Sequence, residues 1–385
     1  MPGDTHPSTH PPLPPTTEDD RVAWLRLLRS RRVGPTTFHR LLAEHGSAAA
    51  AIDALPEVAR AAGVMEYTPC PIGVAEAELR AARAAGATML TSQDAAYPTA
   101  LRDLPDAPPV LWVMGDASVL DRPMIALVGA RNASSLGTRM ARSLAAELSE
   151  AGYVIVSGLA RGVDTAAHLA SLQGGTVAVM AGGVDVIYPA ENARLAADIL
   201  GTGVRLSEHP VGLVPQARHF PGRNRLISGM AQAVVVIEAA AKSGSLITAR
   251  NALDQGREVM AVPGHPIDAR AAGCNMLLRD GATLVRNAAD VIEALPRADA
   301  AAAQPDLPLD PPPRIPEPAA QKRSLRDTAK LHSEILQRLG PSPLAEDQLI
   351  RDLDAPAGAV APVLVDLELD GRITRAPGGL LSISG

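Results

Sequence analysis

Aromatic residues are scarce in this chain of 385 residues, which contains two phenylalanines, two tryptophans and four tyrosines. The core must therefore be aliphatic, and a content of 46% hydrophobic and 20% charged residues is typical of a globular protein. The formal net charge of -6 excludes attraction of the whole chain to a polyanion. Any site for nucleic acid must then be a local basic patch.

Cysteine is nearly absent, and long apolar runs are absent. Cys70 and Cys274 have no metal-ligand spacing and form no disulfide framework, which favours reduced thiols in the cytoplasm. No stretch reaches the roughly 18 apolar residues of a membrane span. The N-terminus also lacks a basic start followed by an apolar segment. The sequence therefore predicts a cytoplasmic protein that is neither secreted nor inserted in a membrane.

The chain is too long for one ordinary domain, and its composition changes along its length. Residues 1–18 are rich in Pro, His and Thr, which predicts a disordered leader. Residues 19–86 carry apolar side chains at spacings near three and four, which predicts a helical domain. A turn at Val33-Gly34-Pro35 gives it a resemblance to a helix-hairpin-helix or SAM-like domain, and a plain helical bundle is the alternative.

The C-terminal part of the chain separates into a linker and a small domain. Residues 296–322 contain eight prolines and little to bury, which predicts an extended linker. Residues 323–385 predict three helices followed by a hairpin, the pattern of a winged helix. Its third helix, residues 360–370, carries Asp366, Glu368 and Asp370 but no basic residue. An acidic helix repels phosphates, so this domain is interpreted as a protein-interaction module rather than a reader of duplex DNA.

Between residues 87 and 295, short β-rich runs alternate with segments of helical length. Near-continuous apolar strands that alternate with helices indicate a parallel sheet covered on both faces. The expected fold is therefore α/β, a Rossmann-like doubly wound parallel sheet. The predicted strands are 125–128, 153–156, 176–179, 204–206, 234–237 and 258–262.

Glycine-rich loops follow three of these predicted strands, and each contains a basic residue. Glycine lets a backbone approach a phosphate, and a helix N-terminus offers unpaired N–H groups to it. Three such loops at one sheet edge favour an anion site over purely structural turns. They supply the candidate residues Arg131, Ser134, Gly158, Arg161, Gly162, Lys242, Ser243, Gly244, Ser245 and Thr248.

The same loops disfavour the common nucleotide cofactors. The first loop does not fit the dinucleotide fingerprint G-x-G-x-x-G, and no Walker A sequence is present. No cofactor and no metal are therefore expected. Ser243 or Ser245 is predicted to be the N-cap of the helix after the third loop.

The segment from His209 to Ile237 contains no Asp or Glu, although the chain has 42 acidic residues. An aromatic ring among arginines is typical of single-strand binding, where charge follows the phosphates and the ring stacks on a base. The segment therefore predicts a basic DNA-binding loop. The alternative is a ring that packs against the sheet while the arginines are only solvated. The candidate residues here are Arg218, His219, Phe220, Arg223, Asn224 and Arg225.

Asp164 and His168 lie four residues apart on one predicted helix, as a metal pair or an acid–base pair would. The sequence supplies neither a third ligand nor a nucleophile beside them. A packing or capping role is therefore favoured for both residues.

These motifs, in this order, resemble those of the DNA processing protein A (DprA/Smf) family. The resemblance is dense over about residues 95–290. Ala190 departs from it, because the family pattern has a basic residue after Tyr188-Pro189. The matching residues are Tyr97-Pro98, Leu101, Pro108-Pro109, Gly115, Val128-Gly129, Arg131, Val156-Ser157-Gly158, Gly162, Asp164, His168, Gly182-Gly183, Tyr188-Pro189, Ser207-Glu208, Phe220, Arg223-Asn224-Arg225, Ser243-Gly244-Ser245, Thr248-Ala249 and Pro263-Gly264.

The resemblance implies a non-enzymatic protein that binds single-stranded DNA in a pocket over the sheet. It also implies a homodimer formed through the Rossmann-like domain, and protection of incoming DNA with loading of RecA during natural transformation. By position, Arg131 and the Phe220–Arg225 loop would line the pocket, with Gly158, Lys242 and Ser243 nearby.

Two other functions stay open at this point. Related proteins of the lysine-decarboxylase-like group cleave nucleotide N-glycosidic bonds, which requires a P-G-G-x-G-T loop followed by a catalytic glutamate. Here residues 242–248 stand in that place, and the next glutamate is Glu258. The third reading is a transcription factor that acts through the winged helix, and the acidic third helix disfavours it.

Overall fold

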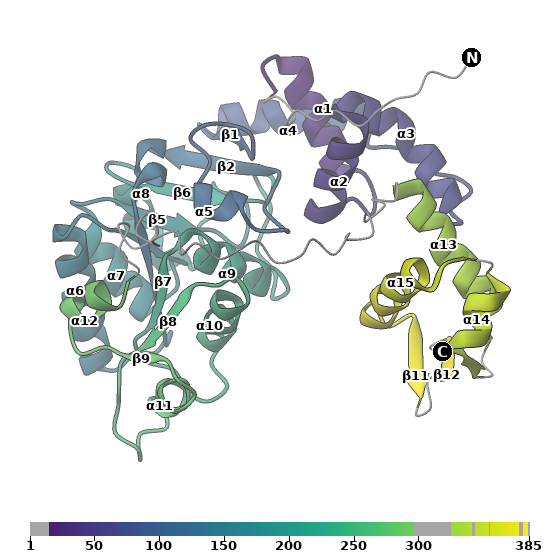
Figure 1. Cartoon of the computed structure of the whole chain (residues 1–385). Helices are drawn as coiled ribbons and strands as arrows, with labels where there is room; N and C mark the ends of the chain where they lie inside the picture. The colour runs from purple at the N-terminus through teal and green to yellow at the C-terminus, as the bar shows by residue number, and fades with distance from the viewer. Residues whose placement is uncertain (1–14, 296–324, 341–342, 354, 377–379, 384–385) are drawn as a thin grey trace, which may run out of the picture. The chain divides into compact units, whose positions relative to one another are not determined.

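The computed structural model describes residues 15–295, 325–340, 343–353, 355–376 and 380–383 (Figure 1). The predicted leader and linker therefore lie outside the described residues. By their internal contacts, the described residues form two compact units. One unit contains residues 16–75 and the helices and strands from 325 onward, and the other contains residues 76–295.

The N-terminal helical domain predicted from the sequence is confirmed. Thr17 starts the first helix with a capping box, in which its hydroxyl accepts from the Asp20 N–H. Gly34 and Pro35 begin the second helix as N-cap and first residue, a position where proline loses no hydrogen bond. Trp24 and Phe38 pack with ring centroids 5.0 Å apart. The helices are α1 Glu18–Arg29, α2 Pro35–His45, α3 Ala48–Ala61 and α4 Ile72–Ala84.

The predicted winged helix is also confirmed, and the structure adds a short strand before its second helix. Its aliphatic core contains Ile335, Leu349 and Leu364. The first helix of this domain packs along α3, where the Ser333 hydroxyl donates to the Ala61 carbonyl (3.2 Å). The elements are α13 Leu325–Arg338, β10 Leu344–Ala345, α14 Glu346–Asp352, α15 Ala357–Leu369, β11 Ile373–Ala376 and β12 Leu380–Ile383.

Residues 88–284 contribute a nine-stranded sheet in the order β1-β2-β6-β5-β4-β3-β7-β8-β9. All six predicted strands are present, and β3 to β9 pair in parallel. The antiparallel strands β1 and β2 at one edge were not predicted. The strands are β1 Thr88–Thr91, β2 Val110–Gly115, β3 Met124–Val128, β4 Val154–Ser157, β5 Thr176–Val179, β6 Val204–Ser207, β7 Ala233–Val236, β8 Glu258–Ala261 and β9 Thr283–Leu284.

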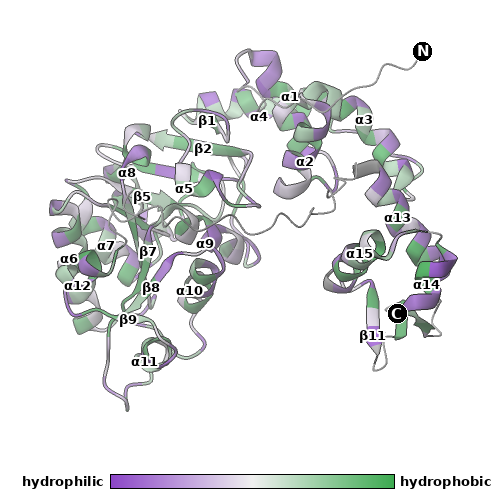
Figure 2. Cartoon of the chain, viewed as in Figure 1, coloured by the Kyte–Doolittle hydropathy of each residue, from purple (hydrophilic) through white to green (hydrophobic). Residues whose placement is uncertain are grey.

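Helices cover both faces of this sheet, as the apolar strands require (Figure 2). One face carries α6 Ser135–Glu150, α7 Val163–Ser171 and α12 Ala288–Ala294. The other carries α5 Thr99–Arg102, α9 His219–Met230, α10 Ser245–Asp254 and α11 Ala272–Arg279. A further helix, α8 Ala193–Ile199, packs beside β5. The core is almost entirely aliphatic, as the scarcity of aromatic residues predicts.

The strand order contains a topological switch point between β3 and β7. From β3 the chain proceeds through β4, β5 and β6 on one side, and it then returns to β7 on the other side. The loops that follow β3 and β7 therefore diverge. Open α/β sheets bind their ligands in the crevice that this divergence leaves.

The prediction that Phe220 to Arg225 form a loop is wrong, because these residues lie in the first turns of α9. Proline and glycine in this stretch suggested a loop. Pro221, however, lies in the first helical turn, where a missing N–H costs nothing. Leu226, Ile227 and Met230, farther along, are buried on the sheet. Their burial stabilises the helix from its C-terminal end.

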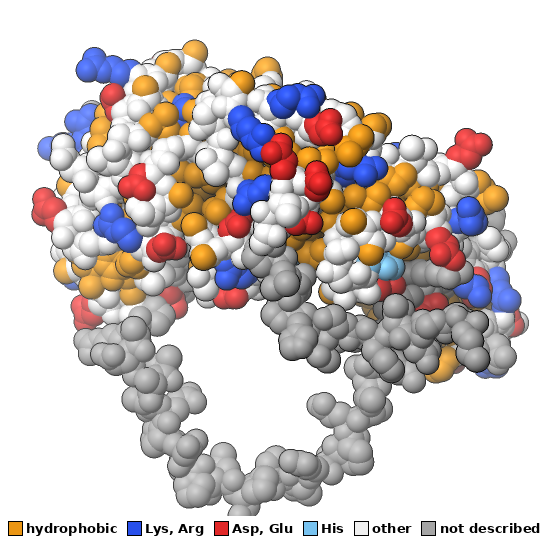
Figure 3. All heavy atoms as spheres, turned by 90° about the horizontal axis from the view of Figure 1, so that it is seen from above, with side chains coloured by type: hydrophobic (Ala, Val, Ile, Leu, Met, Phe, Trp, Pro, Cys, Tyr) orange, Lys and Arg blue, Asp and Glu red, His pale blue; other side chains and the backbone are white. Residues whose placement is uncertain are grey.

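Basic and acidic side chains are interspersed on the face seen in Figure 3, where they form no continuous basic patch. Within the described residues, no helix is both long and apolar enough to span a membrane. Cys70 and Cys274 are buried and form no disulfide bond.

Candidate nucleic-acid interface

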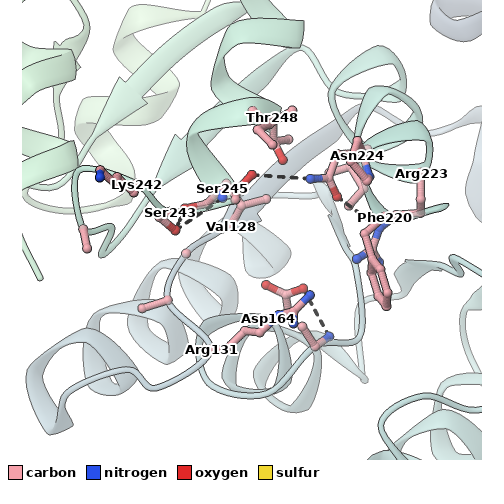
Figure 4. Close-up of a pocket in the computed structure, with 18 of the residues that line it drawn as sticks. Val128, Arg131, Asp164, Phe220, Arg223, Asn224, Lys242, Ser243, Ser245 and Thr248 are labelled. Atoms are coloured by element: carbon pink, nitrogen blue, oxygen red, sulfur yellow. Dashed lines mark hydrogen bonds between the residues drawn. The ribbon is translucent and has the colours of Figure 1, made fainter. Parts of the chain in front are cut away.

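A pocket of about 950 Å³ lies at the switch point between β3 and β7, and we call it the switch-point pocket (Figure 4). Its volume is at the upper end of the range of about 300–1,000 Å³ that small-molecule sites occupy. Its walls are the β3–α6 loop, the start of α7, the first turns of α9 and the β7–α10 loop. The predicted residues that line it are Arg131, Phe220, Arg223, Asn224, Lys242, Ser243, Gly244, Ser245 and Thr248.

Cationic side chains outnumber carboxylates in this pocket. Arg131, Lys242 and Arg270 are exposed at its walls, and Asp164 is the sole carboxylate among the described residues that line it. Arg223 is only 5% exposed and donates to the carbonyls of Gly158 and Val179 (2.7 Å to the latter). Burial lowers the pKa of Arg223 to about 10, so it remains charged at neutral pH. Arg270 is paired with Asp268 (Nε to Oδ1, 3.2 Å), which leaves Arg131 and Lys242 as the exposed cations of the pocket without an ion pair among the described residues.

Phe220 lines two cavities. One is the switch-point pocket, and the other is a cavity of about 210 Å³ that Gly158 and Arg161 also line. The Arg131 guanidinium lies 5.2 Å from the centre of the Phe220 ring, within cation–π range. The Tyr188 ring lies 5.6 Å away. The ring is half-buried, so it is neither a core residue nor an isolated surface residue.

Two of the three predicted anion sites are already occupied by carboxylates of the chain itself. Glu238, at the end of β7, accepts from the Ser134 hydroxyl (2.5 Å) and the Ser134 N–H (3.1 Å) at the start of α6. Asp164 accepts from the N–H groups of Gly158 (3.1 Å) and Ala160 (3.2 Å) in the second loop. These N–H groups are not available to a phosphate.

No carboxylate of the described residues accepts a hydrogen bond from the third loop. Gly244 is the N-cap of α10 and makes no side-chain capping bond, so the prediction of Ser243 or Ser245 as N-cap is wrong. Their hydroxyls lie 2.7 Å apart and hydrogen-bond to each other. Thr248 is 2% exposed, yet it lines the pocket (Figure 4). The start of α10 therefore offers the Ser243 and Ser245 hydroxyls and Lys242 to one anion, while the N–H groups of residues 245–247 already donate within this turn.

Several predicted site residues lie outside both cavities. Arg225 forms ion pairs with Glu208 (2.5 Å) and Asp106 (3.4 Å). Gly162 is required by close packing, because a Cβ there would lie 2.3 Å from the Ala130 carbonyl oxygen. The residues that line neither cavity are Ser134, Gly162, Arg218, His219 and Arg225.

The lack of acidic residues in the segment 209–237 led to the prediction that Arg225 binds DNA. The counterion of Arg225 lies just outside that segment. Glu208 immediately precedes the segment, and Glu238 immediately follows it. Charge counting along the sequence missed both carboxylates.

His168 has the packing role that the sequence favoured. It is fully buried, and its Nδ1 lies 2.8 Å from the Thr176 hydroxyl oxygen. That hydroxyl donates to the Ile155 carbonyl (2.7 Å), so Nδ1 carries the proton and donates. Burial, with a smaller effect from the Arg223 charge, lowers the pKa of His168 to about 3. In the described part of the chain, no three His, Cys, Asp or Glu residues gather as a metal site.

Three further residues that line the pocket were not predicted as site residues: Asn132, Tyr188 and Arg270. Arg270 follows β8, whose carboxyl end points to the same sheet edge as those of β3 and β7. That rule alone could have indicated its place.

Fold and pocket together define a class of protein: a Rossmann-like α/β protein with a basic switch-point pocket, flanked in sequence by a helical domain and a winged helix. Family models match each part. Residues 88–296 match DNA recombination-mediator protein A, 18–81 a DprA-like N-terminal HHH domain and 317–379 a DprA winged helix domain. The chain belongs to the DNA processing protein A (DprA/Smf) family, a family of DNA-processing recombination mediators.

Known relatives agree with this assignment. DNA processing protein DprA of Bacillus subtilis is 43% identical over 221 residues, covering 57% of this chain and 74% of its own length. Protein Smf of Escherichia coli is 38% identical over 290 residues, covering 74% of this chain and 75% of its own.

Two solved structures are similar as well. DNA processing protein A of Streptococcus pneumoniae has a TM-score of 0.55 at 38% identity, covering 59% of this chain and 79% of that one. The Helicobacter pylori protein has a TM-score of 0.50 at 31% identity, covering 54% and 96%. The work on the latter describes a single-stranded DNA binding mode.

Proposed function

We propose that this protein binds single-stranded DNA in the switch-point pocket, protects incoming DNA and loads RecA onto it during natural transformation. The observation that carries the proposal is that the exposed side chains of Arg131 and Lys242 line the same pocket as the half-buried Phe220 ring, with the Arg131 guanidinium 5.2 Å from the ring centre. Cations can follow phosphates while the ring stacks on a base, a contact worth about 1–3 kcal/mol per base. The single-stranded DNA binding described for the Helicobacter pylori relative supports it.

The proposal treats the protein as a binder and not as an enzyme. Cleavage of a glycosidic bond commonly uses a pair of carboxyl groups, one as acid and one as base or nucleophile. Among the described residues lining the pocket only Asp164 is acidic, and one of its oxygens already accepts two backbone N–H groups. Binding without hydrolysis therefore suits these residues better than the nucleotide N-glycosidase alternative.

The proposal includes a homodimer through the Rossmann-like domain. The sheet ends at the two-residue edge strand β9, where Leu284 is exposed, and Met276 on the neighbouring α11 is exposed too. Exposed apolar side chains beside a short edge strand suit a protein interface. The cytoplasm, where RecA and reduced thiols occur together, is the proposed location.

Fluorescence anisotropy with a single-stranded oligonucleotide, a blunt duplex of equal length and mononucleotides tests the binding. We expect the single strand to bind most tightly and its affinity to fall steeply with salt, because phosphate contacts release counterions. Equal affinity for the duplex would contradict the proposal. RecA loading is tested by the rate of RecA filament formation on single strands covered with single-strand binding protein, which this protein should increase.

A further inference from the structure

One buried carboxyl group in the switch-point pocket is not explained by phosphate binding. Asp164 is 7% exposed and lies in the pocket wall near Arg131 (Figure 4). A carboxylate repels a phosphate, so this side chain opposes the backbone of a nucleic acid. The part of a nucleotide that it can bind is a base edge that carries N–H groups.

The two oxygens of Asp164 differ in their partners. Oδ2 accepts from the N–H groups of Gly158 (3.1 Å) and Ala160 (3.2 Å), which fixes the side chain in one orientation. The neighbouring Ser157 hydroxyl donates to the Leu127 carbonyl (2.7 Å). That hydroxyl also lies close to the carboxyl group, but its one proton goes to Leu127, so among the described residues no donor is directed at Oδ1. Because Asp164 lines the pocket, Oδ1 is the acceptor left for a ligand.

Burial strengthens a hydrogen bond between Oδ1 and a ligand. Loss of water raises the pKa of Asp164, while the charge of Arg223 and the two backbone N–H groups oppose that rise. A carboxylate that has lost its water gains more from one new hydrogen bond than an exposed carboxylate does. A ligand N–H that reaches Oδ1 replaces that water.

We propose that Asp164 makes the pocket select bases that carry an exocyclic amino group, such as cytosine, over thymine and uracil. Cytosine offers its N4 amino group to a carboxylate, whereas thymine presents the O4 acceptor at the same place. The N3–H of thymine or uracil lies between two carbonyl oxygens, and both would repel Oδ1. This selectivity rests on the proposed binding of single-stranded DNA.

The test compares oligo-deoxycytidine with oligo-deoxyuridine of the same length by fluorescence anisotropy on the full-length protein. These bases differ at position 4 and in the N3 proton, and neither carries a methyl group. We expect the cytosine strand to bind about tenfold or more tightly, as one hydrogen bond to a charged group provides. This comparison needs no variant, so it stands even if a substitution destabilises the protein.

The variant Asp164→Asn separates base selection from the structural role of this side chain. Its amide oxygen can still accept from Gly158 and Ala160, which leaves the NH₂ group to face the pocket. A donor there favours the O4 atom of uracil, so the preference should reverse. Asp254→Asn, an exposed change at the C-terminal end of α10, is the matched control and should keep the cytosine preference.

The outcomes distinguish this inference from the proposed function. A cytosine preference that reverses in Asp164→Asn and persists in Asp254→Asn supports it. Equal binding of both strands by the unaltered protein overturns base selection but leaves single-strand binding intact. Loss of both strands in equal proportion in Asp164→Asn also overturns it, because Asp164 would then only hold its loop. If neither strand binds the unaltered protein, both the inference and the proposed function fail.

Discussion

Arg131 and Phe220 act on each other before any DNA is bound. The guanidinium lies 5.2 Å from the ring centre, and no ion pair within the described residues fixes it elsewhere. A cation–π contact of this kind is worth about 0.5–1 kcal/mol at an exposed site. If the pocket binds DNA as proposed, the contributions of charge and stacking to affinity should therefore be coupled.

The first prediction measures both contributions and their coupling. Arg131→Ala should weaken binding to all sequences and reduce the salt dependence by about one phosphate. Phe220→Ala should cost about 1–3 kcal/mol in binding at an almost unchanged salt slope, and less with an abasic strand. The double variant should lose less than the sum, because each single change already breaks the contact between the two side chains.

Thermal melting of the three variants is the control, since loss of a buried ring alone can destabilise a protein. Strict additivity would show that the contact between Arg131 and Phe220 does not matter for binding. A Phe220→Ala protein that melts far below the parent and binds abasic and normal strands equally poorly would place the ring in the core.

The second prediction contrasts a cation in the pocket with one outside it. Lys242→Ala should lower the salt slope by about one phosphate, because Lys242 is exposed in the pocket wall beside the start of α10. Arg225→Gln, which removes the same charge, should leave the slope unchanged and lower the melting temperature, since Arg225 is paired with Glu208 (2.5 Å). Equal slopes for the two variants would contradict this division.

At the scale of elements, α7 contains two buried titratable groups, Asp164 and His168, whose titrations change the stability in opposite directions. The pKa of His168 is lowered from 6.5 to about 3. Between these two pH values the unfolded chain binds a proton at His168 and the folded chain does not. Its contribution to stability is therefore present above pH 6.5 and is lost as the pH falls. Burial raises the pKa of Asp164 above its usual value. The contribution of Asp164 to stability is therefore lost as the pH rises through this raised pKa.

The third prediction follows from these signs. Lowering the pH from 6.5 to 5 should destabilise the α/β domain by up to about 2 kcal/mol through His168. Trp112, buried in β2, reports on this domain alone in a Trp24→Phe background. Urea unfolding at the two pH values gives the difference. His168→Gln should flatten the pH dependence, and an unchanged slope would show that His168 is not its source.

At the scale of the whole molecule, the described residues that line the pocket all fall between Val128 and Arg270. The winged helix contributes none of them, and its helix α15 exposes Asp366 and Glu368. It packs instead on the N-terminal helices, where Arg40 donates to the Thr328 hydroxyl (2.9 Å). Its contacts thus stabilise the N-terminal domain rather than the pocket.

The fourth prediction is that a chain ending at residue 295 binds single-stranded DNA as tightly as the full chain. The same truncation should lower the melting temperature reported by Trp24, because it uncovers the side of α3 on which α13 packs. Anisotropy and tryptophan fluorescence measure the two effects on one sample. Loss of nearly all binding would make the winged helix a primary DNA site and contradict the role proposed for α15.

The sequence by itself determined the parts of this protein that depend on local patterns. Near-continuous apolar strands separated by helices predicted the parallel sheet. A strand that is buried on both faces has apolar side chains at successive positions and not only at every second one. Spacings of three and four predicted the helices of both flanking domains. The glycine loops after β3, β4 and β7 indicated the sheet edge at which the pocket lies, since parallel strands all end at that edge.

Only the tertiary structure decided which of these loops can hold an anion and which arginines are free. Glu238 reaches Ser134 from another strand, and Glu208 neutralises Arg225 across 17 positions of sequence, so neither pair follows a local pattern. Packing on the sheet, not propensity, made a helix of Phe220–Arg225. The strength of an electrostatic interaction depends on the distance between the two charges. Residues that are far apart in the sequence come close only in the folded chain.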